Sequence, residues 1–132
     1  MIKKLEIKTG SRTEVIDITD KIQKVISDSK IKSGICIIYV PHTTAGITVN
    51  ENYDPSVRVD ILEALEKIAP LSARYKHTEG NADSHIKTSM VGSSTTLLIE
   101  DSKILLGSWQ GIMFCEFDGP RNRKLVVKII AG

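Results

Sequence analysis

The sequence predicts an α+β fold in which antiparallel, sandwich-like β-sheets pack against two to three helices. Three observations lead to this prediction. The last third of the chain is a succession of strand-like runs, two stretches have the apolar spacing of helices, and no repeat or low-complexity linker divides the chain. Successive strands favour antiparallel pairing with helices packed on one side. At 132 residues, the chain has the size of one domain, so we expect a single domain over residues 1–132.

The N-terminal segments predict two strands followed by a short helix. Residues 4–8 and 14–19 alternate between apolar and polar side chains, with a turn at residues 10–11. Thr19 or Asp20 is expected to cap the helix, because apolar side chains recur at helical spacing directly after them.

The middle of the chain predicts a central strand, a short strand and a second helix. Residues 35–40 are all apolar or aromatic, which is typical of a strand buried on both faces of a sheet. A polar loop leads to a short strand at residues 47–49. Asp54 is the expected N-cap of the next helix and Pro55 its first residue. Apolar residues at steps of four, four and three make this helix amphipathic, and Pro70 is expected to end it.

The last part of the chain is expected to be rich in strands. Residues 71–90 are polar, with one short helix expected near residues 84–90. The strands predicted after it are residues 94–99, 103–106, 110–118 and 124–130.

Composition excludes several classes of protein. Hydrophobic residues make up 41% and charged residues 26%, which is the range of globular domains. The net charge of +2 is small and the basic residues are scattered, so we expect no nucleic-acid partner. No run approaches the roughly 20 apolar residues of a membrane span, so we expect no membrane contact and a cytoplasmic protein. Cys36 and Cys115 lie in apolar runs and are expected to be buried free thiols.

All three histidines of the chain lie in polar motifs. His42 follows the central strand, and His77 and His85 bracket a polar segment that contains Glu79. Imidazole is the commonest metal ligand in proteins and exchanges protons near neutral pH. The alternative is that three surface histidines each form hydrogen bonds within their own loops. We expect instead that the three rings share one site.

Three imidazoles and one open position are a familiar arrangement of catalytic zinc. We therefore predict His42, His77 and His85 as ligands of a divalent metal, with zinc as the expected ion. Glu79 or Glu51 would act as the general base or orient a ligand.

Other polar residues could hold an anionic substrate. Ser93 and Ser94 follow a glycine and could offer N–H and O–H groups to a phosphate, with Lys87, Arg121 and Arg123 as cationic contacts. Serines at this point are equally typical of a turn that enters a strand. Asn50 belongs to a polar motif that also contains Glu51.

Two residues have more than one explanation. Trp109, the only tryptophan, lies between glycines and could contact substrate or pack in an interface. Glu116 interrupts an apolar run, so it needs a partner if it is buried, and Arg121 or Arg123 could supply one. Glu116 could instead face the histidine site or solvent.

Together these segments resemble the YjbQ-like family. The motifs that carry the resemblance are His42-Thr43-Thr44-Ala45, Asn50-Glu51-Asn52, Asp54-Pro55, residues 77–85 with Lys87, Gly92-Ser93-Ser94, residues 106–111 and residues 116–121. The chain departs from the family's usual pattern at two positions. Leu98 stands where the family commonly has proline and Ser102 where it commonly has glycine, so the geometry of the hairpin at these positions is expected to differ. The resemblance implies a homotrimer with a metal or anion site between subunits, and a weak thiamine-phosphate synthase activity. That reaction joins a pyrimidine diphosphate to a thiazole phosphate and releases pyrophosphate.

The leading hypothesis is a metal-dependent enzyme that acts on a phosphorylated small molecule, as a thiamine-phosphate synthase-like transferase or as a hydrolase. The alternative is a homotrimer that binds a small molecule or anion without catalysis. A purely structural role explains the density of polar motifs less well.

Overall fold

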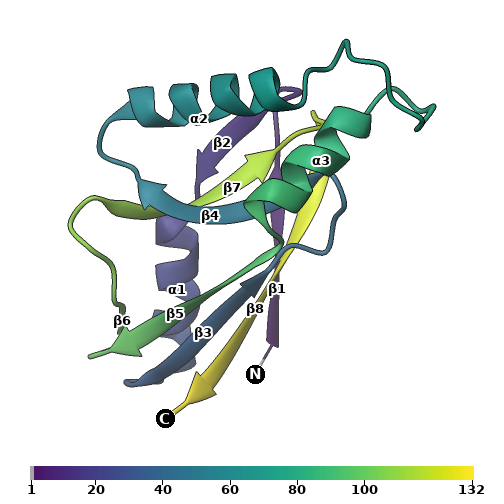
Figure 1. Cartoon of the computed structure of the whole chain (residues 1–132). Helices are drawn as coiled ribbons and strands as arrows, with labels where there is room; N and C mark the ends of the chain where they lie inside the picture. Colours follow the sequence, from purple (N-terminus) through teal and green to yellow (C-terminus); the bar gives the residue numbers. More distant parts are fainter. Residues whose placement is uncertain (1) are drawn as a thin grey trace.

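A computed structural model describes residues 2–132 and confirms the predicted α+β class (Figure 1). The strands are β1 (Ile2–Lys8), β2 (Glu14–Asp17), β3 (Gly34–Tyr39), β4 (Ala45–Glu51), β5 (Ser94–Glu100), β6 (Lys103–Ile104), β7 (Gln110–Glu116) and β8 (Asn122–Ala131). The helices are α1 (Thr19–Ser29), α2 (Pro55–Ile68) and α3 (Ala82–Val91).

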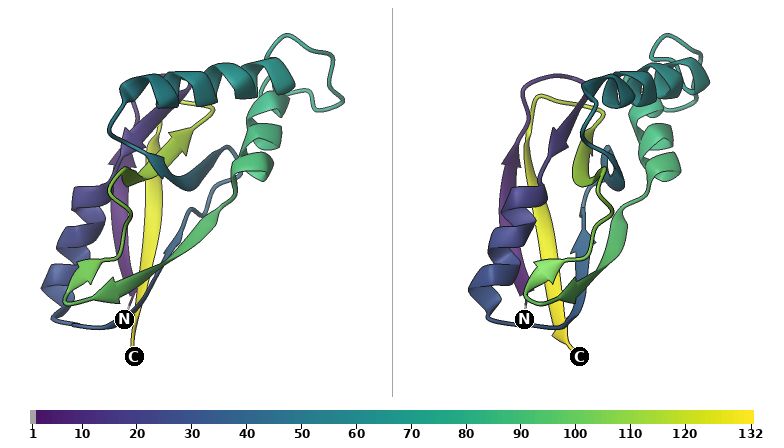
Figure 2. Two further views of the ribbon diagram at one scale, coloured as in Figure 1. Left: turned by 60° about the vertical axis from the view of Figure 1, so that its left-hand side comes forward. Right: turned by 90° about the vertical axis from the view of Figure 1, so that its left-hand side faces the viewer.

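The strands form two antiparallel sheets. One sheet has the order β1-β8-β3-β5-β6, and the other has the order β2-β7-β4. The turn after β1 therefore joins two sheets, because β1 pairs with β8 whereas β2 pairs with β7. Helix α1 lies beside the larger sheet, α2 crosses the end of the smaller one, and α3 packs along β4 (Figures 1 and 2).

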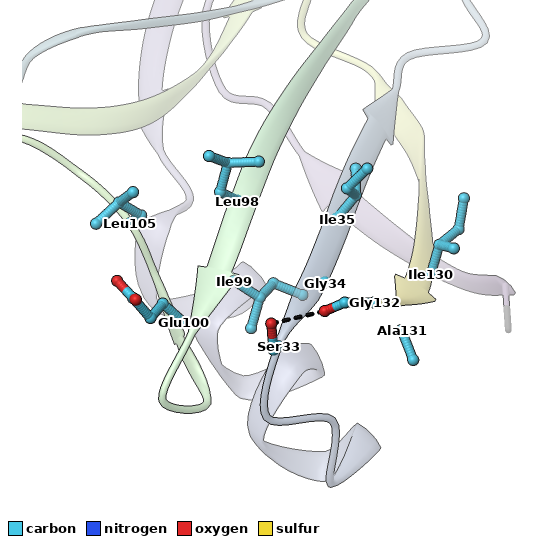
Figure 3. A pocket seen from close by; sticks show the side chains of 10 residues that line it. All are labelled: Ser33, Gly34, Ile35, Leu98, Ile99, Glu100, Leu105, Ile130, Ala131 and Gly132. Atoms are coloured by element: carbon cyan, nitrogen blue, oxygen red, sulfur yellow. Dashed lines mark hydrogen bonds between the residues drawn. The ribbon is translucent and has the colours of Figure 1, made fainter.

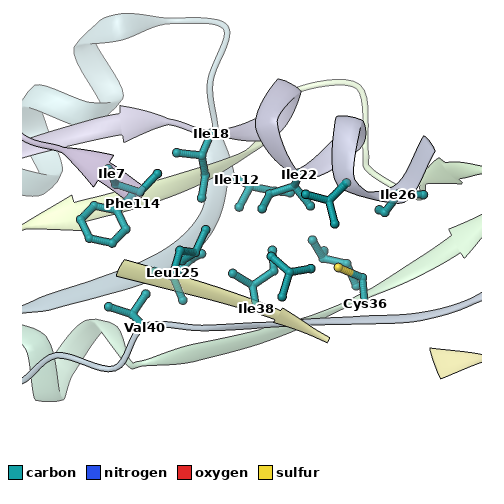
Figure 4. Packing of buried hydrophobic residues seen from close by; sticks show 14 of the residues in the cluster. Ile7, Ile18, Ile22, Ile26, Cys36, Ile38, Val40, Ile112, Phe114 and Leu125 are labelled. Carbon is teal, nitrogen blue, oxygen red and sulfur yellow. The ribbon is translucent and has the colours of Figure 1, made fainter. Parts of the chain in front are cut away.

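The main hydrophobic core lies between the two sheets and α1. Ile22 and Ile26 of α1 point toward Cys36 and Ile38 of β3, and Phe114 of β7 completes this layer (Figure 4). All five side chains are fully buried. The apolar residues thus recur at regular spacing in the sequence because each helix or strand buries one of its faces in this core.

The residue predicted to cap the N-terminus is correct for α2 and wrong for α1. Asp54 caps α2, since its side chain accepts a hydrogen bond from the amide of Ser56 at 2.9 Å. The predicted cap of α1 is wrong, because Thr19 already lies within the helix. The carboxylate of Asp17 accepts from the amide of Thr19 at 2.9 Å and takes that role instead.

The apolar run of β3 is central, but it is not buried on both faces as predicted. Cys36 and Ile38 are fully buried, whereas Ile35 is 38% and Tyr39 47% exposed. Strand alternation places the latter two on the outer face of the larger sheet. The part of that face formed by Ile35, Leu98 and Ile130 is apolar and exposed, whereas Thr96 and Lys128 flank Ile37 on the same face.

Both cysteines are buried free thiols, as predicted. Burial raises the pKa of Cys36 to about 11 and that of Cys115 to about 12, so neither is a reactive thiolate. Over residues 2–132, none of the helices is both long enough and apolar enough to cross a bilayer.

Candidate functional site

A polar pocket of about 530 Å³ lies where the β3–β4 loop, the start of α3 and the β7–β8 connection meet. His42, Glu79 and His85 line it. The other lining residues are Tyr39, Pro41, Thr43, Thr44, Asn81, Asp118, Arg121 and Arg123. We call this the histidine pocket. It brings together two of the three predicted histidines, a predicted carboxylate and two predicted anion contacts.

His77 lies next to the histidine pocket rather than in it. Its ring stands edge-on to that of His85, with ring centres 5.0 Å apart. The two rings line a neighbouring depression of about 340 Å³. His77 Nε2 lies 3.1 Å from Asn81 Oδ1 and 3.8 Å from Glu79 Oε2. His85 therefore belongs to both hollows, and Glu79 bridges from His77 to the histidine pocket.

The ring of His42 is fixed by the backbone of β8. Its Nε2 accepts a hydrogen bond from the amide of Lys124 at 2.8 Å. A neutral imidazole has one donor and one acceptor nitrogen, so the proton of His42 sits on Nδ1. Burial, and secondly the positive charge of Arg123, lower the pKa of His42. His42 is therefore neutral near pH 7 and offers an N–H group on Nδ1.

A buried ion pair forms the floor of the histidine pocket. Arg123 Nε donates to Glu116 Oε1 at 2.9 Å, and its Nη2 contacts Glu116 Oε2 and donates to Thr44 Oγ1 at 2.8 Å. Glu116 is completely buried and Arg123 is 4% exposed. Burial alone raises the pKa of Glu116, but hydrogen bonds from Arg123, the Asp118 amide and Thr9 outweigh it, so this pKa is lowered. Of the three alternatives left open for Glu116, the structure shows the buried ion pair, and Arg123 rather than Arg121 is the partner.

One amino group of Arg123 has no partner in this pair. None of residues 2–132 accepts a hydrogen bond from Nη1, although Nε and Nη2 are both bonded. Arg123 lines the histidine pocket. Its guanidinium therefore places a fixed positive charge at this pocket, and Nη1 keeps a hydrogen-bonding capacity that none of residues 2–132 uses.

The rim of the pocket carries a second arginine. Arg121 Nε donates to the carbonyl of Asp118 at 2.7 Å, and Nη2 donates to its carboxylate at 3.1 Å. Asn81 also donates to that carboxylate at 2.8 Å. Burial raises the pKa of Asp118, but these bonds outweigh it and the pKa is lowered. Asp118 is therefore ionised and orients Arg121.

A three-histidine metal site does not fit the geometry within one chain. His77 and His85 lie side by side, edge-on, with ring centres 5.0 Å apart. His42 has no nitrogen free to bind a metal, because its Nε2 lone pair is taken by Lys124 and its Nδ1 is protonated. In the part of the chain that the structure describes, no group of three His, Cys, Asp or Glu side chains is placed to hold an ion.

Three of the predicted site residues lie at the opposite end of the smaller sheet. Asn50 and Glu51 end β4, which is 7 residues long, whereas the loop with His42 enters its other end (Figure 1). At the usual rise per residue, β4 separates the two ends by roughly 20 Å. Trp109 lies near Glu51 and packs edge-on against Tyr53 with ring centres 5.0 Å apart. The structure therefore does not bring these residues to the histidines.

Lys87 and the two serines do not line the histidine pocket either. Lys87 is 1% exposed and contacts Asp83 at 2.9 Å and Glu66 at 2.8 Å, so both neighbouring carboxylates neutralise it. Ser93 and Ser94 enter β5, where the carbonyl of Ser93 accepts from the amide of Val40. The turn explanation of these serines agrees with this geometry.

Asp118, Asn81 and Thr44 were missed as pocket residues. Arg123 was expected both as a cationic contact for a phosphate and as a possible partner of Glu116, and it lines the pocket. Nothing local marks Thr44 or Asn81, because their roles depend on segments far away in the chain. Thr44 meets Arg123 across 79 positions of sequence.

Solved structures share this fold over nearly the whole chain. A protein of the YjbQ/UPF0047 family from Clostridium acetobutylicum has a TM-score of 0.95 and 50% identity, covering 97% of this chain and 99% of that one. A YbjQ-like protein from Sulfolobus solfataricus has a TM-score of 0.95 and 32% identity, covering 100% and 97%.

Sequence relatives agree with the structural comparison. The UPF0047 protein of Methanocaldococcus jannaschii is 58% identical over 98% of this chain and 94% of its own length. The UPF0047 protein YugU of Bacillus subtilis is 47% identical over 98% and 99%. The model of the family described as UPF0047 protein YjbQ-like matches residues 3–132. By fold, by sequence and by the motifs that surround its histidine pocket, the chain belongs to the YjbQ-like UPF0047 family.

Proposed function

We propose that the histidine pocket binds the phosphate group of a phosphorylated small molecule. The observation that carries this proposal is Arg123, which lines the pocket, is held rigidly by Glu116 and keeps its Nη1 without an acceptor among residues 2–132. Arg121 and the N–H of His42 supply further donors in the same pocket. Planar guanidinium groups match phosphate geometry and cannot be deprotonated in proteins.

We further propose that the protein is an enzyme acting on this substrate. Departure of a phosphate or pyrophosphate requires positive charge placed in advance around the leaving oxygens. Arg121 and Arg123 would provide that charge, and His85 could exchange a proton with the leaving group. The thiamine-phosphate synthase reaction implied by the resemblance belongs to this class, and hydrolysis of a phosphoester is the other candidate.

The binding step can be tested by calorimetric titration with inorganic phosphate and pyrophosphate. Arg123→Met and Arg121→Met should each weaken binding by roughly tenfold to a hundredfold, the usual effect of losing a charged hydrogen bond. Lys24→Met is the matched control, since Lys24 makes an exposed ion pair with Asp28 on α1. Equal affinities in all four proteins would refute the proposal.

Turnover decides between an enzyme and a binding protein. The purified protein would be assayed for pyrophosphate release from the thiamine precursors and for hydrolysis of a panel of phosphate esters. Release that is lost in Arg123→Met supports the enzyme. Phosphate binding without turnover on any substrate favours the non-catalytic alternative.

His77 and His85 support a second candidate, a metal-dependent form of the enzyme. Their rings are adjacent and Glu79 Oε2 lies 3.8 Å from His77 Nε2, so three side chains of the types that bind zinc lie close together, and a rearrangement of them would be needed to hold an ion. A bound ion would supply a Lewis acid beside the phosphate site. Zinc titration of the metal-free protein tests this: His77→Ala should abolish binding, whereas His42→Ala should retain it. Loss of binding in His42→Ala would restore the three-histidine site.

We propose, finally, that copies of this chain associate through the outer face of the larger sheet. Leu98, Ile35 and Ile130 are cross-strand neighbours there, and they border an apolar hollow of about 340 Å³ (Figure 3). Contiguous exposed apolar surface is typical of an interface. Tyr39 lies on the same face and lines the histidine pocket, so a partner copy would approach the site. The number of copies, three, comes from the resemblance, as does our expectation of a site near the interface.

We propose that the protein is cytoplasmic, because free buried cysteines such as Cys36 and Cys115 are usual in a reducing compartment.

A further inference from the structure

A buried charge network lies behind the wall of the histidine pocket that α3 forms. The carboxylate of Asp83 is 1% exposed and accepts from Arg12 Nη1 at 3.2 Å and Nη2 at 3.0 Å. Lys87 donates to the same carboxylate at 2.9 Å. Burial raises the pKa of Asp83, but the bonds from Arg12 and Lys87 outweigh it and the pKa is lowered. Neither Arg12 nor Asp83 lines the pocket.

The first turn of α3 depends on this network for its position. No side chain caps the N-terminus of α3, so tertiary contacts must fix its place. Ser84 Oγ donates to the carbonyl of Phe117 at 2.5 Å, and Arg12 Nη2 approaches Ser84 Oγ at 3.4 Å. These bonds attach the turn to the end of β7.

Arg12 also contacts the other wall of the pocket. Its backbone carbonyl accepts a hydrogen bond from the amide of Gly119 at 3.0 Å. A side chain at Gly119 would be impossible there, since an added Cβ would lie 2.3 Å from the carbonyl of Ser11. The segment with Arg12 is therefore packed tightly against the β7–β8 connection, next to Asp118.

From these contacts we infer that Arg12 and Asp83 are positioning residues of the histidine pocket. Their two-pronged ion pair fixes the α3 wall, with Asn81 and His85, against the wall that carries Asp118 and Arg121. This inference rests on the proposed phosphate site and says which residues outside the pocket set its geometry. The fork of the guanidinium is essential, because it contacts both carboxylate oxygens at once.

Arg12→Lys tests the inference, since lysine keeps the charge and loses the fork. We expect inorganic phosphate to bind on the order of tenfold more weakly, the usual effect of removing a residue that orients a direct contact. We also expect the ring resonances of His85 to shift in proton–nitrogen NMR spectra, because its ring moves relative to Asp118. An affinity and a His85 spectrum that match the wild type would overturn the inference.

Gln23→Ala is the control for lost stability alone. Gln23 attaches α1 to β6 through hydrogen bonds with the carbonyl of Ser102 and the amide of Ile104, remote from the pocket. It should lower the melting temperature and leave phosphate affinity and the His85 resonances unchanged. If Gln23→Ala weakens phosphate binding as much as Arg12→Lys, general destabilisation explains both effects and the inference fails.

The two proposals can fail separately. Absence of phosphate binding in the wild type would refute the proposed function. The His85 resonances of Arg12→Lys would still decide whether Arg12 positions that ring: a shift absent from Gln23→Ala supports the inference, and an unchanged spectrum refutes it.

Discussion

Replacing Arg123 with methionine should destabilise the protein strongly, because it leaves the carboxylate of Glu116 buried without its counter-charge. Glu116 is completely buried, and Arg123 is its only cationic hydrogen-bond partner among residues 2–132. Thr9 and the amide of Asp118 would remain as neutral donors. They satisfy the oxygens of Glu116 without neutralising its charge.

The size of the effect follows from burial. Removing one partner of a buried ion pair costs about 3–5 kcal/mol. For a chain of 132 residues, an unfolding entropy of about 2.1 cal/mol/K per residue converts this loss into a melting temperature lower by roughly 11–18 °C.

A double variant separates stability from phosphate binding. Glu116→Gln combined with Arg123→Met leaves no buried charge, and the new amide oxygen can still accept from Thr9 or Asp118. Replacement of a whole buried pair is often neutral, so we expect most of the lost stability to return. Phosphate affinity should stay as weak as in Arg123→Met, since the free guanidinium N–H is gone in both.

Thermal unfolding followed by circular dichroism, with phosphate calorimetry on the same samples, measures both effects. The pH dependence of the melting temperature tests the direction of the effect. Without Arg123, burial raises the pKa of Glu116, so protonation relieves the penalty and the gap to the wild type should narrow as pH falls from 8 to 5. A melting temperature of Arg123→Met within about 2 °C of the wild type would refute the reasoning, as would a double variant that regains phosphate binding.

Three further predictions concern other parts of the molecule. His42 has a lowered pKa in the folded state. Its contribution to stability is therefore complete above pH ~6.5 and is lost as the pH falls through the folded pKa. The melting temperature of His42→Ala should depend less on pH between 7 and 5 than that of the wild type. Lys87→Met leaves buried Asp83 with Arg12 as its remaining cation, so unfolding in urea should show a loss of about 3 kcal/mol. Phosphate affinity should fall much less than in Arg12→Lys, because the fork of Arg12 still holds both oxygens of Asp83; an equal loss of affinity would show that Lys87 positions the pocket too. Leu98→Lys places a charge in the exposed apolar part of the outer face of the larger sheet. Light scattering after gel filtration should therefore show a smaller assembly than the wild type. An unchanged mass would argue against an interface on this face.

Local features of the fold follow directly from neighbouring residues. Asp54 and Pro55 predict the start of α2 because capping and the fixed backbone angle of proline act within one turn. The continuous apolar run at residues 35–40 likewise identifies β3 as a strand. It does not reveal that one face stays open, because burial of Ile35 depends on what packs against the sheet. Sequence alone also indicated that Glu116 needs a partner if it is buried, but its burial was decided by the packing of the two sheets.

The sequence by itself determined the α+β class, most element positions and the family resemblance. It also singled out the histidines, two of which, His42 and His85, meet in one pocket. Only the tertiary structure decided which polar residues join them. His42 meets Lys124 across 82 positions, Lys87 turns into the interior, and Glu51 ends up at the far end of β4. The physical reason is that periodicity and capping act between neighbours, whereas a pocket is assembled by sheet pairings between segments that are distant in the chain.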